Sequence, residues 1–211
     1  MSKKPLIILY GGGGHGKVVA DALEKEGTYQ IAGWLDDAAS GEIYGIPVLG
    51  GKDAMMAMKE KGITHAFVSI GSPAARQSIQ DALKKAGLTI ATIRHPSAQV
   101  ARGAVIGEGT VLMPNAVVGP DVKIGDGCII NTGATVDHDC RLGDFAHVAP
   151  GAHLAGGVTV GAMTHIGIGS CVKEGVTIGK NVMLGAGSVV IDDLPDGCTA
   201  FGVPAKVQTG R

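Results

Sequence analysis

The sequence predicts two domains: an α/β domain with a small, Rossmann-like parallel sheet, followed by a parallel β-helix of hexapeptide repeats. From Val100 to Val190, every sixth residue is Leu, Ile or Val without an insertion. The fourth residue after each of these sixteen aliphatics is small or apolar, and Gly directly follows eight of them. Before this array, strand patterns alternate with helix patterns. We therefore assign residues 1–95 to the α/β domain and residues 96–211 to the β-helix and a short tail.

The hexad pattern predicts the geometry of the β-helix. Three hexads form one coil, so residues eighteen apart stack on strands about 4.8 Å apart. The repeated aliphatic points into the prism, the small residue fills the remaining interior, and we expect the Gly after the aliphatic to relieve the turn. Cys128 and Cys140 occupy interior positions, so we interpret them as small core residues. Asp192 to Gly197 ends the array.

The elements of the first domain follow from runs of apolar residues and from their terminators. We expect strands over residues 6–10, 30–35, 65–70 and 88–93; the first is a continuous apolar run, which suits a parallel strand buried on both faces. Helices are expected over residues 18–26, 53–61 and 73–85, with Asp53 as an N-cap, Pro73 as a first helical residue, and Gly27, Gly62 and Gly87 as the stops.

A glycine-rich loop joins the first strand to the first helix. Gly11, Gly13 and Gly16 match the pattern GxGxxG, and Asp36 follows twenty residues after Gly16. The same residues match a P-loop, but Val18 stands where a P-loop needs Ser or Thr, so we reject that interpretation. Backbone amides at a helix N-terminus bind a diphosphate. The alternative is a tight turn that requires glycine.

Asp36 and Asp37 close the second strand, where a carboxylate can accept a ribose hydroxyl or a base edge. The alternative is a pair of solvated aspartates. A complete NAD-binding domain is not expected, because too few residues precede the hexads to form one.

Composition excludes several classes of protein. The net charge of −1 and the lack of long basic runs argue against nucleic-acid binding. The apolar run near the amino terminus is too short for a signal peptide or a membrane span. The four cysteines have no CxxC pair, which favours a reduced, cytoplasmic setting.

Four histidines interrupt the repeats within 28 residues: His138, His147, His153 and His165. His147 and His165 are eighteen apart and should stack, whereas His138 falls in a turn beside carboxylates. A carboxylate that raises the pKa of a histidine suits it to general-base catalysis. Zinc is the competing use of clustered histidines, as in the γ-class carbonic anhydrases. No two histidines here have the spacing of five found there, so we expect no metal.

The whole chain resembles the bacterial sugar O/N-acetyltransferases of the NeuD and PglD type. The resemblance rests on the Gly-x-Gly-His-Gly-Lys loop, on Asp36-Asp37, and on His95-Pro-Ser-Ala before the hexads. It also rests on His138-Asp139-Cys140 with His147 and on the tail Gly202-Val203-Pro204-Ala205-Lys206. It implies a left-handed β-helix, a homotrimer, and acetyl-CoA bound between neighbouring prisms.

The resemblance also implies roles for individual residues. His138 corresponds to the catalytic base and Asp139 to its orienting acid, which is Glu in the bacillosamine-pathway members, so a looser contact is expected here. His147, Ile168 and Ala186 correspond to positions that contact acetyl-CoA. The nucleotide-sugar site corresponds to Gly13, Gly14, His15, Asp36 and Asp37, with Gly71 and Arg76 as further candidates.

The resulting prediction is an acetyl-CoA-dependent N-acetyltransferase. Its acceptor would be a nucleotide-linked 4-amino-4,6-dideoxy sugar of bacterial glycan biosynthesis, with UDP favoured over GDP or dTDP by family frequency. Acetyl would pass directly to the sugar amine. Two alternatives remain open: an O-acetyltransferase for sialic acid or a similar sugar, and a non-catalytic nucleotide-sugar-binding scaffold.

Overall fold

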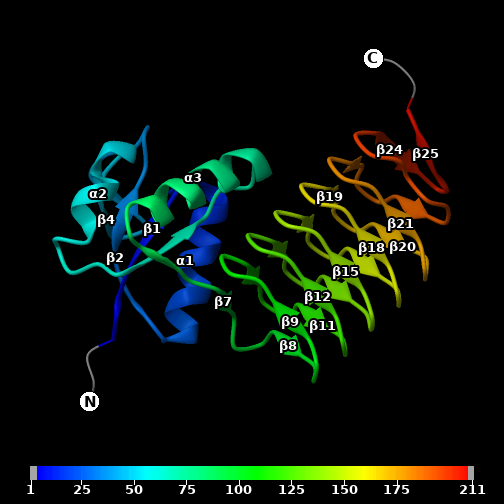
Figure 1. Ribbon diagram of the computed structural model, residues 1–211, viewed down its shortest axis with the longest axis horizontal. Helices are drawn as coiled ribbons and strands as arrows, with labels where there is room; N and C mark the ends of the chain where they lie inside the picture. Colours follow the sequence, from blue (N-terminus) through cyan, green and yellow to red (C-terminus); the bar gives the residue numbers. More distant parts are fainter. Residues whose placement is uncertain (1–3, 209–211) are drawn as a thin grey trace. The chain divides into compact units, whose positions relative to one another are not determined.

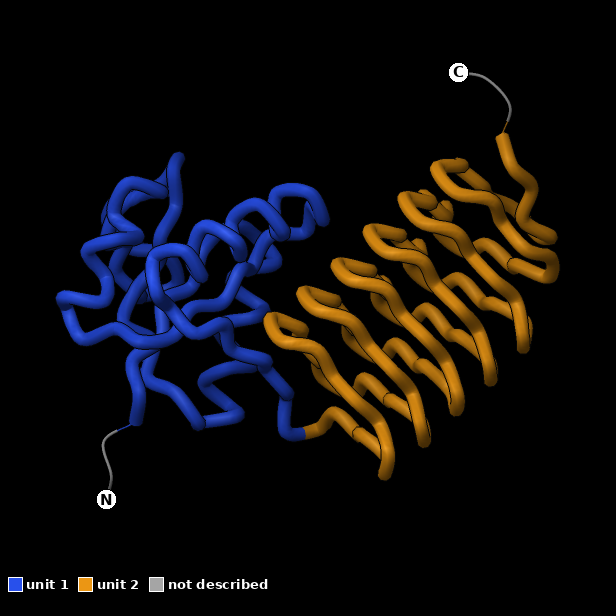
Figure 2. The backbone as a smooth tube through the Cα atoms, in the orientation of Figure 1, with its two compact units in different colours: residues 1–96 blue, residues 97–211 orange. Residues whose placement is uncertain are grey.

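The computed structural model of the protein describes residues 4–208. Two compact units divide the chain, one ending at Pro96 and the other beginning at Ser97 (Figures 1 and 2). The first contains a six-stranded sheet with helices, and the second contains the stacked coils of a β-helix.

The sheet of the first unit has the strand order β3-β4-β2-β1-β5-β6. Its strands are β1 (Leu6–Tyr10), β2 (Gln30–Leu35), β3 (Glu42–Ile43), β4 (Ile46–Gly50), β5 (His65–Val68) and β6 (Thr89–Ile90). All neighbours pair in parallel except β3 and β4. The predicted α/β class is therefore confirmed, and the sheet is mixed rather than wholly parallel.

The β3–β4 hairpin was not predicted. Tyr44 and Gly45 form its turn, and both have positive φ angles, of 54° and 71°. Such turns favour Asn-Gly, so Tyr at the first position hides the signal. Pro47 in β4 further weakens the strand pattern, although Pro is tolerated in a strand near a sheet edge.

Two predicted elements of the first unit are shorter in the structure. The helix expected over residues 53–61 is a 3₁₀ turn (Lys52–Ala54) followed by α2 (Met55–Met58). Asp53 lies inside the 3₁₀ turn and is not an N-cap. Within residues 51–60 only Met55 and Met58 are buried, so no longer apolar face holds a helix there. The strand expected over residues 88–93 is divided into β6 and β7 (Ile93–Arg94).

The two long helices end where the sequence predicted. Helix α1 (Gly14–Glu26) stops at Gly27, which has a φ of 73°, and α3 (Pro73–Lys85) begins with Pro73 after the N-cap Ser72. Helix α1 starts four residues earlier than predicted, inside the glycine loop. A Cβ at Gly16 would collide with the carbonyl oxygen of Gly11, so only glycine lets the helix begin this close to β1.

The second unit is a prism with three faces, each formed by stacked parallel strands, here called faces 1, 2 and 3. Face 1 contains β10 (Val111–Leu112), β13 (Ile129–Ile130), β16 (His147–Val148), β19 (His165–Ile166), β22 (Met183–Leu184) and β24 (Thr199–Gly202). Face 2 contains β8 (Gln99–Val100), β11 (Val117–Val118), β14 (Thr135–Val136), β17 (His153–Leu154), β20 (Cys171–Val172) and β23 (Val189–Val190). Face 3 contains β9 (Val105–Ile106), β12 (Lys123–Ile124), β15 (Arg141–Leu142), β18 (Thr159–Val160) and β21 (Thr177–Ile178).

The register between coils is eighteen residues, as predicted. Ile129 pairs with His147, His147 with His165, and His165 with Met183. The repeated aliphatics and the small residues together form one continuous core inside the prism. Cys128 and Cys140 are both fully buried there, which confirms their interpretation as core residues.

The predicted reason for the repeated glycines was wrong. The glycines that follow the aliphatics do not supply the left-handed turns; residues two positions later do, such as Gly127, Gly169 and Asp139. The glycines after the aliphatics face the backbone of the next coil, where a Cβ on Gly161 would lie 2.5 Å from the carbonyl carbon of Gly179. Close stacking of the coils, rather than backbone freedom, requires them.

The tail folds back onto the end of the prism. Strand β24 continues face 1 beyond β22 and pairs antiparallel with β25 (Ala205–Val207). This hairpin was not predicted. Across residues 4–208, no helix combines the length and hydrophobicity needed to cross a bilayer.

Buried hydroxyls give the prism a testable stability determinant. Thr164 is fully buried; its Oγ1 donates to the carbonyl of Gly179 at 2.6 Å and accepts the N–H of Val182 at 3.0 Å. Replacing Thr164 by Val leaves both backbone groups unpaired, so the free energy of unfolding should fall by about 1–3 kcal/mol, as measured by denaturant unfolding. Thr159→Val, on the outer side of face 3, should change it by less than about 0.5 kcal/mol. Equal effects of the two variants would contradict this explanation.

Candidate active site

His138 lies in an exposed turn between β14 and β15, outside the core, as predicted. Its Nδ1 is 2.8 Å from Oδ2 of Asp139, and its backbone N–H donates to Oδ1 of Asp137 at 2.7 Å. Asp139 has a φ of 60°, the left-handed conformation that Asp tolerates better than most residues. The turn thus places one carboxylate on the imidazole of His138 and another on its backbone N–H.

The carboxylates set the protonation behaviour of His138. The hydrogen bond to Asp139 raises the pKa of His138, and the charge of Asp137 raises it further. With Nδ1–H donated to Asp139, the neutral ring presents Nε2 as the free base. The looser contact expected for Asp in place of Glu is not observed, because the left-handed backbone brings the shorter side chain to hydrogen-bond distance.

The next coil supports the imidazole from below. Gly156 lies eighteen residues after His138, and a Cβ at Gly156 would lie 2.5 Å from both Cε1 and Nε2 of the ring. The backbone N–H of Gly157 donates to the carbonyl of His138 at 2.8 Å. The ring therefore rests against a residue without a side chain. Asp137 and Gly156 were both missed as site residues, because their roles depend on coil stacking and turn geometry.

His147 and His165 stack on face 1, as predicted. Their ring centroids are 4.7 Å apart and the rings are nearly perpendicular, at 85°. Asn131 uses its carbonyl oxygen to accept the N–H of Thr132, so its amide nitrogen faces Nε2 of His147, at 3.1 Å. This arrangement makes Nε2 of His147 an acceptor and places its proton on Nδ1. His153 lies on face 2, with Nδ1 2.9 Å from Oγ1 of Thr135.

Ile168 and Ala186 lie in exposed turns on successive coils. The turns follow β19 and β22, and the carbonyl of Ile168 accepts the N–H of Gly187 at 2.8 Å. Both turns lie at the edge between faces 1 and 2, whereas the turn of His138 lies at the edge between faces 2 and 3. Within one chain, these cofactor candidates and the candidate base therefore occupy different edges of the prism.

The glycine loop of the first unit borders a pocket of about 480 Å³. Six of the seven predicted nucleotide-sugar residues line it: Gly13, Gly14, His15, Asp36, Asp37 and Gly71. Tyr10, Ser69 and Ile70 complete much of the wall and were not predicted. The pocket lies at the carboxyl ends of parallel strands β1, β2 and β5, which is where ligands bind in such sheets.

The two aspartates of this pocket differ in their hydrogen-bond partners and in their exposure. Asp36 accepts the backbone N–H of Gly12 at 2.8 Å and those of Ala38 and Ala39 at 2.9 and 3.0 Å. These hydrogen bonds, that of Gly12 first, lower the pKa of Asp36 and tie the glycine loop to β2. Asp37 is exposed and accepts the hydroxyl of Tyr10 at 2.5 Å and the N–H of Lys52 at 2.7 Å. Asp37 is therefore the more accessible of the two to a ligand.

His15 is neutral in this pocket. Burial, followed by the nearby charge of Arg76, lowers the pKa of His15 to about 4. Its Nε2 is buried and has no hydrogen-bond partner among residues 4–208. Arg76 does not line the pocket: it is buried and donates to the carbonyls of Ile70 and Gly71 at 2.9 and 2.8 Å. Arg76 thus fixes the loop that forms the opposite wall.

Residues 4–208 contain no cluster of three or more His, Cys, Asp or Glu side chains that could hold a metal ion. Two features of the described residues bear on chemistry: an exposed imidazole with a raised pKa on the prism, and a pocket of about 480 Å³ in the first unit.

Comparison with known proteins identifies the class of both units. Residues 6–83 match the PglD N-terminal domain, and residues 103–138 match the bacterial transferase hexapeptide repeats. A perosamine N-acetyltransferase from Caulobacter crescentus is 41% identical, with 97% of each chain covered and a TM-score of 0.95. That structure, a variant with one histidine replaced by asparagine, contains CoA and GDP-perosamine.

Two further relatives agree with this assignment. The acetyltransferase domain of PglB from Neisseria gonorrhoeae, solved with acetyl coenzyme A, is 40% identical; the match covers 97% of this chain and 100% of that domain, with a TM-score of 0.93. The UDP-N-acetylbacillosamine N-acetyltransferase of Bacillus subtilis is 36% identical over 115 residues, which span 50% of each chain.

The fold and the comparisons define a hexapeptide-repeat acyltransferase. More specifically, the chain belongs to the PglD-like family of sugar N-acetyltransferases, whose members use acetyl-CoA and nucleotide-linked amino sugars. The predicted family and fold are confirmed, and an acetyl-CoA-dependent sugar N-acetyltransferase is confirmed as the class to which the chain belongs.

The His138–Asp139 contact predicts a specific change in titration. Asp139→Asn removes the charged acceptor that stabilises the imidazolium, so the pKa of His138 should fall toward the ordinary value of about 6.5. An NMR titration of the imidazole signals measures this shift. The matched control is Asp121→Asn, at the same turn position one coil earlier with a φ of 57°, which should leave the titration unchanged. An unchanged pKa in Asp139→Asn would contradict the assigned role.

Proposed function

We propose that this chain transfers the acetyl group of acetyl-CoA to the amine of a nucleotide-linked 4-amino-4,6-dideoxy sugar, with His138 as the general base. The observation that carries the proposal is the Nδ1–Oδ2 contact of 2.8 Å between His138 and Asp139, which leaves Nε2 of this exposed side chain as the base. A histidine so oriented removes a proton near neutral pH.

The reaction needs no covalent enzyme intermediate. The sugar amine attacks the thioester carbonyl while Nε2 of His138 accepts the proton of the amine. The carboxylate of Asp139 stabilises the resulting imidazolium, as the raised pKa of His138 indicates. A backbone amide stabilises the tetrahedral oxyanion, and collapse of that intermediate releases CoA thiolate, which takes up the proton. Binding both substrates in the correct orientation supplies much of the acceleration.

The pocket at the glycine loop is proposed as the nucleotide-sugar site. Gly13 and Gly14 begin α1 and present backbone N–H groups, which suit a diphosphate. His15, with its buried and unpartnered Nε2, supplies a further polar atom, and Asp37 offers an exposed carboxylate for a ribose or base. Gly71 and Arg76 shape the facing loop. UDP, GDP and dTDP sugars are all candidates, and the GDP-perosamine-bound relative supports testing GDP alongside UDP.

Acetyl-CoA is proposed to bind along the coils at His147, Ile168 and Ala186. These residues lie on face 1 and at its edge with face 2, away from the edge that carries His138. One prism therefore does not provide the whole site, which supports the proposal of a homotrimer with each site between neighbouring prisms. A cytoplasmic location is proposed because all four cysteines are free, as expected in a reducing compartment.

The proposed base is tested by His138→Ala. Loss of general-base catalysis should lower kcat by about 10²–10⁴-fold, measured as CoA-thiol release with a panel of UDP-, GDP- and dTDP-4-amino sugars. His153→Ala, another exposed histidine of the prism, should stay within about twofold of wild type. Turnover of His138→Ala close to wild type would remove His138 from the mechanism.

The same assay with sialic acid added to the acceptors, together with a calorimetric binding measurement for the nucleotide sugars, separates the alternative functions. Turnover on sialic acid alone would identify an O-acetyltransferase. Tight nucleotide-sugar binding without CoA release from any acceptor would identify a non-catalytic scaffold.

The proposed nucleotide-sugar site is tested by His15→Ala. Removing a side chain that lines the pocket should raise the KM for the nucleotide sugar about tenfold or more, and should leave the KM for acetyl-CoA unchanged. Because the pKa of His15 is about 4, His15 stays neutral above pH 6 and should add no titration step to this KM between pH 6 and 8. His65→Ala, on β5 of the same unit, is the control. An unchanged KM in His15→Ala would contradict the assignment.

A further inference from the structure

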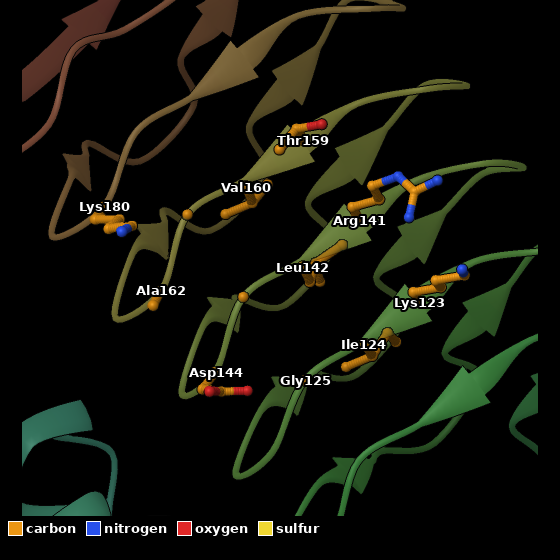
Figure 3. A pocket seen from close by; sticks show the side chains of 12 residues that line it. Lys123, Ile124, Gly125, Arg141, Leu142, Asp144, Thr159, Val160, Ala162 and Lys180 are labelled. Atoms are coloured by element: carbon orange, nitrogen blue, oxygen red, sulfur yellow. The ribbon is translucent and has the colours of Figure 1, made fainter.

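Face 3 of the prism carries a shallow groove of about 500 Å³ that none of the functional assignments uses. Its floor is formed by the stacked strands β12, β15 and β18, and Figure 3 shows the side chains that line it. Lys123, Arg141 and Thr159 follow one another on adjacent coils at the start of these strands. Asp144, Ala162 and Lys180 lie at the opposite end of the face.

The two cations of this groove are unusual for the prism. Sixteen strands, β8 to β23, each present one outward residue, and within these described strands only Lys123 and Arg141 carry a formal charge. The two residues are in register on neighbouring strands, so like charges face each other about 4.8 Å apart along the backbone. Such pairs are unfavourable unless an anion compensates them.

Within the described part of the chain, no carboxylate lies at ion-pair distance from either cation. Neither Lys123 nor Arg141 makes an ion pair within residues 4–208. Their further register partners on face 3 are Val105 and Thr159, which carry no negative charge. The acid in the groove, Asp144, lies at the other end and already accepts the N–H of Asp126 at 2.9 Å.

The pair lies close to the proposed base along the chain. Arg141 is the third residue after His138, so their Cα atoms are at most about 10 Å apart, the length of three extended residues. A guanidinium and an ammonium on adjacent strands, with the hydroxyl of Thr159 on the next coil, form a set of donors suited to phosphate oxygens. Both substrates of the proposed reaction carry phosphates: the nucleotide sugar has a diphosphate, and acetyl-CoA has a diphosphate and a 3′-phosphate.

We propose that Lys123 and Arg141 form a phosphate-binding subsite on face 3 that holds one of the two co-substrates next to His138. The identity of the ligand rests on the proposed acetyl transfer. The arrangement of Lys123 and Arg141 is independent of that proposed function. The pair increases the affinity for the phosphate-bearing substrate and takes no part in proton transfer. Its loss should therefore weaken binding and leave kcat at saturation nearly unchanged.

The test compares full-length wild type with Lys123→Gln, Arg141→Gln and the double variant. Isothermal titration calorimetry gives dissociation constants for CoA, dephospho-CoA, UDP and GDP. Each single variant should weaken one phosphate ligand about tenfold and the double variant more, while the other class of ligand is unaffected. Lys180→Gln, a cation at the far end of the same groove, should stay within about twofold, and thermal unfolding checks the fold of every variant.

The pattern of losses identifies the source of the phosphate. A loss for CoA that is absent for dephospho-CoA assigns the subsite to the 3′-phosphate, and equal losses for both assign it to the diphosphate of CoA. A loss for UDP or GDP assigns it to the nucleotide sugar.

Three results would overturn the subsite: wild-type affinity of the double variant for every ligand, an equal loss in Lys180→Gln, and no binding of any phosphate ligand by wild type. Normal binding by a wild-type protein that shows no turnover would instead contradict the proposed function and leave the subsite in place.

Discussion

The in-register hydrogen bonding between successive coils is the constraint on which the rest of the prism depends. Each strand of two residues is too short to be stable alone, so its backbone groups must pair with those of the neighbouring coil. The N–H of His147, for example, donates to the backbone carbonyl of Thr164 at 2.9 Å. This pairing fixes which face and which edge every side chain occupies. It also brings the coils so close together that a Cβ on glycines such as Gly161 and Gly167 would collide with the backbone of the next coil.

The candidate site on the prism lies in a turn, outside the stacked strands. His138 stands outside the core, in a turn whose left-handed residue is Asp139 rather than glycine, so a position that the fold needs for its geometry also places a carboxylate 2.8 Å from Nδ1 of the proposed base. The first unit achieves a comparable result differently. There, the carboxylate of Asp36 accepts three backbone N–H groups, of which that of Gly12 fixes the glycine loop, and Asp37 remains exposed beside it.

The sequence was sufficient for features that depend on spacing and not for those that depend on local geometry. The period of six predicted the prism, its register, the buried Cys128 and Cys140, and the stacking of His147 on His165. The β3–β4 hairpin was missed because its left-handed turn begins with Tyr44. Gly156 could have been found by adding eighteen to His138, but the ring contact itself appears only when the rotamer of His138 is known.

The eighteen-residue register has a consequence for how such chains can diverge. An insertion of one whole coil leaves every side chain on its original face and edge, so the prism can lengthen without altering the chemistry already present. An insertion of a single residue in the strands after His138 would instead move every later residue out of place, and Gly156 would no longer lie beneath the imidazole. Evolution of this architecture should therefore proceed by exchange of complete coils and by point substitutions in turns, with single-residue length changes confined to the turns that can bulge outward.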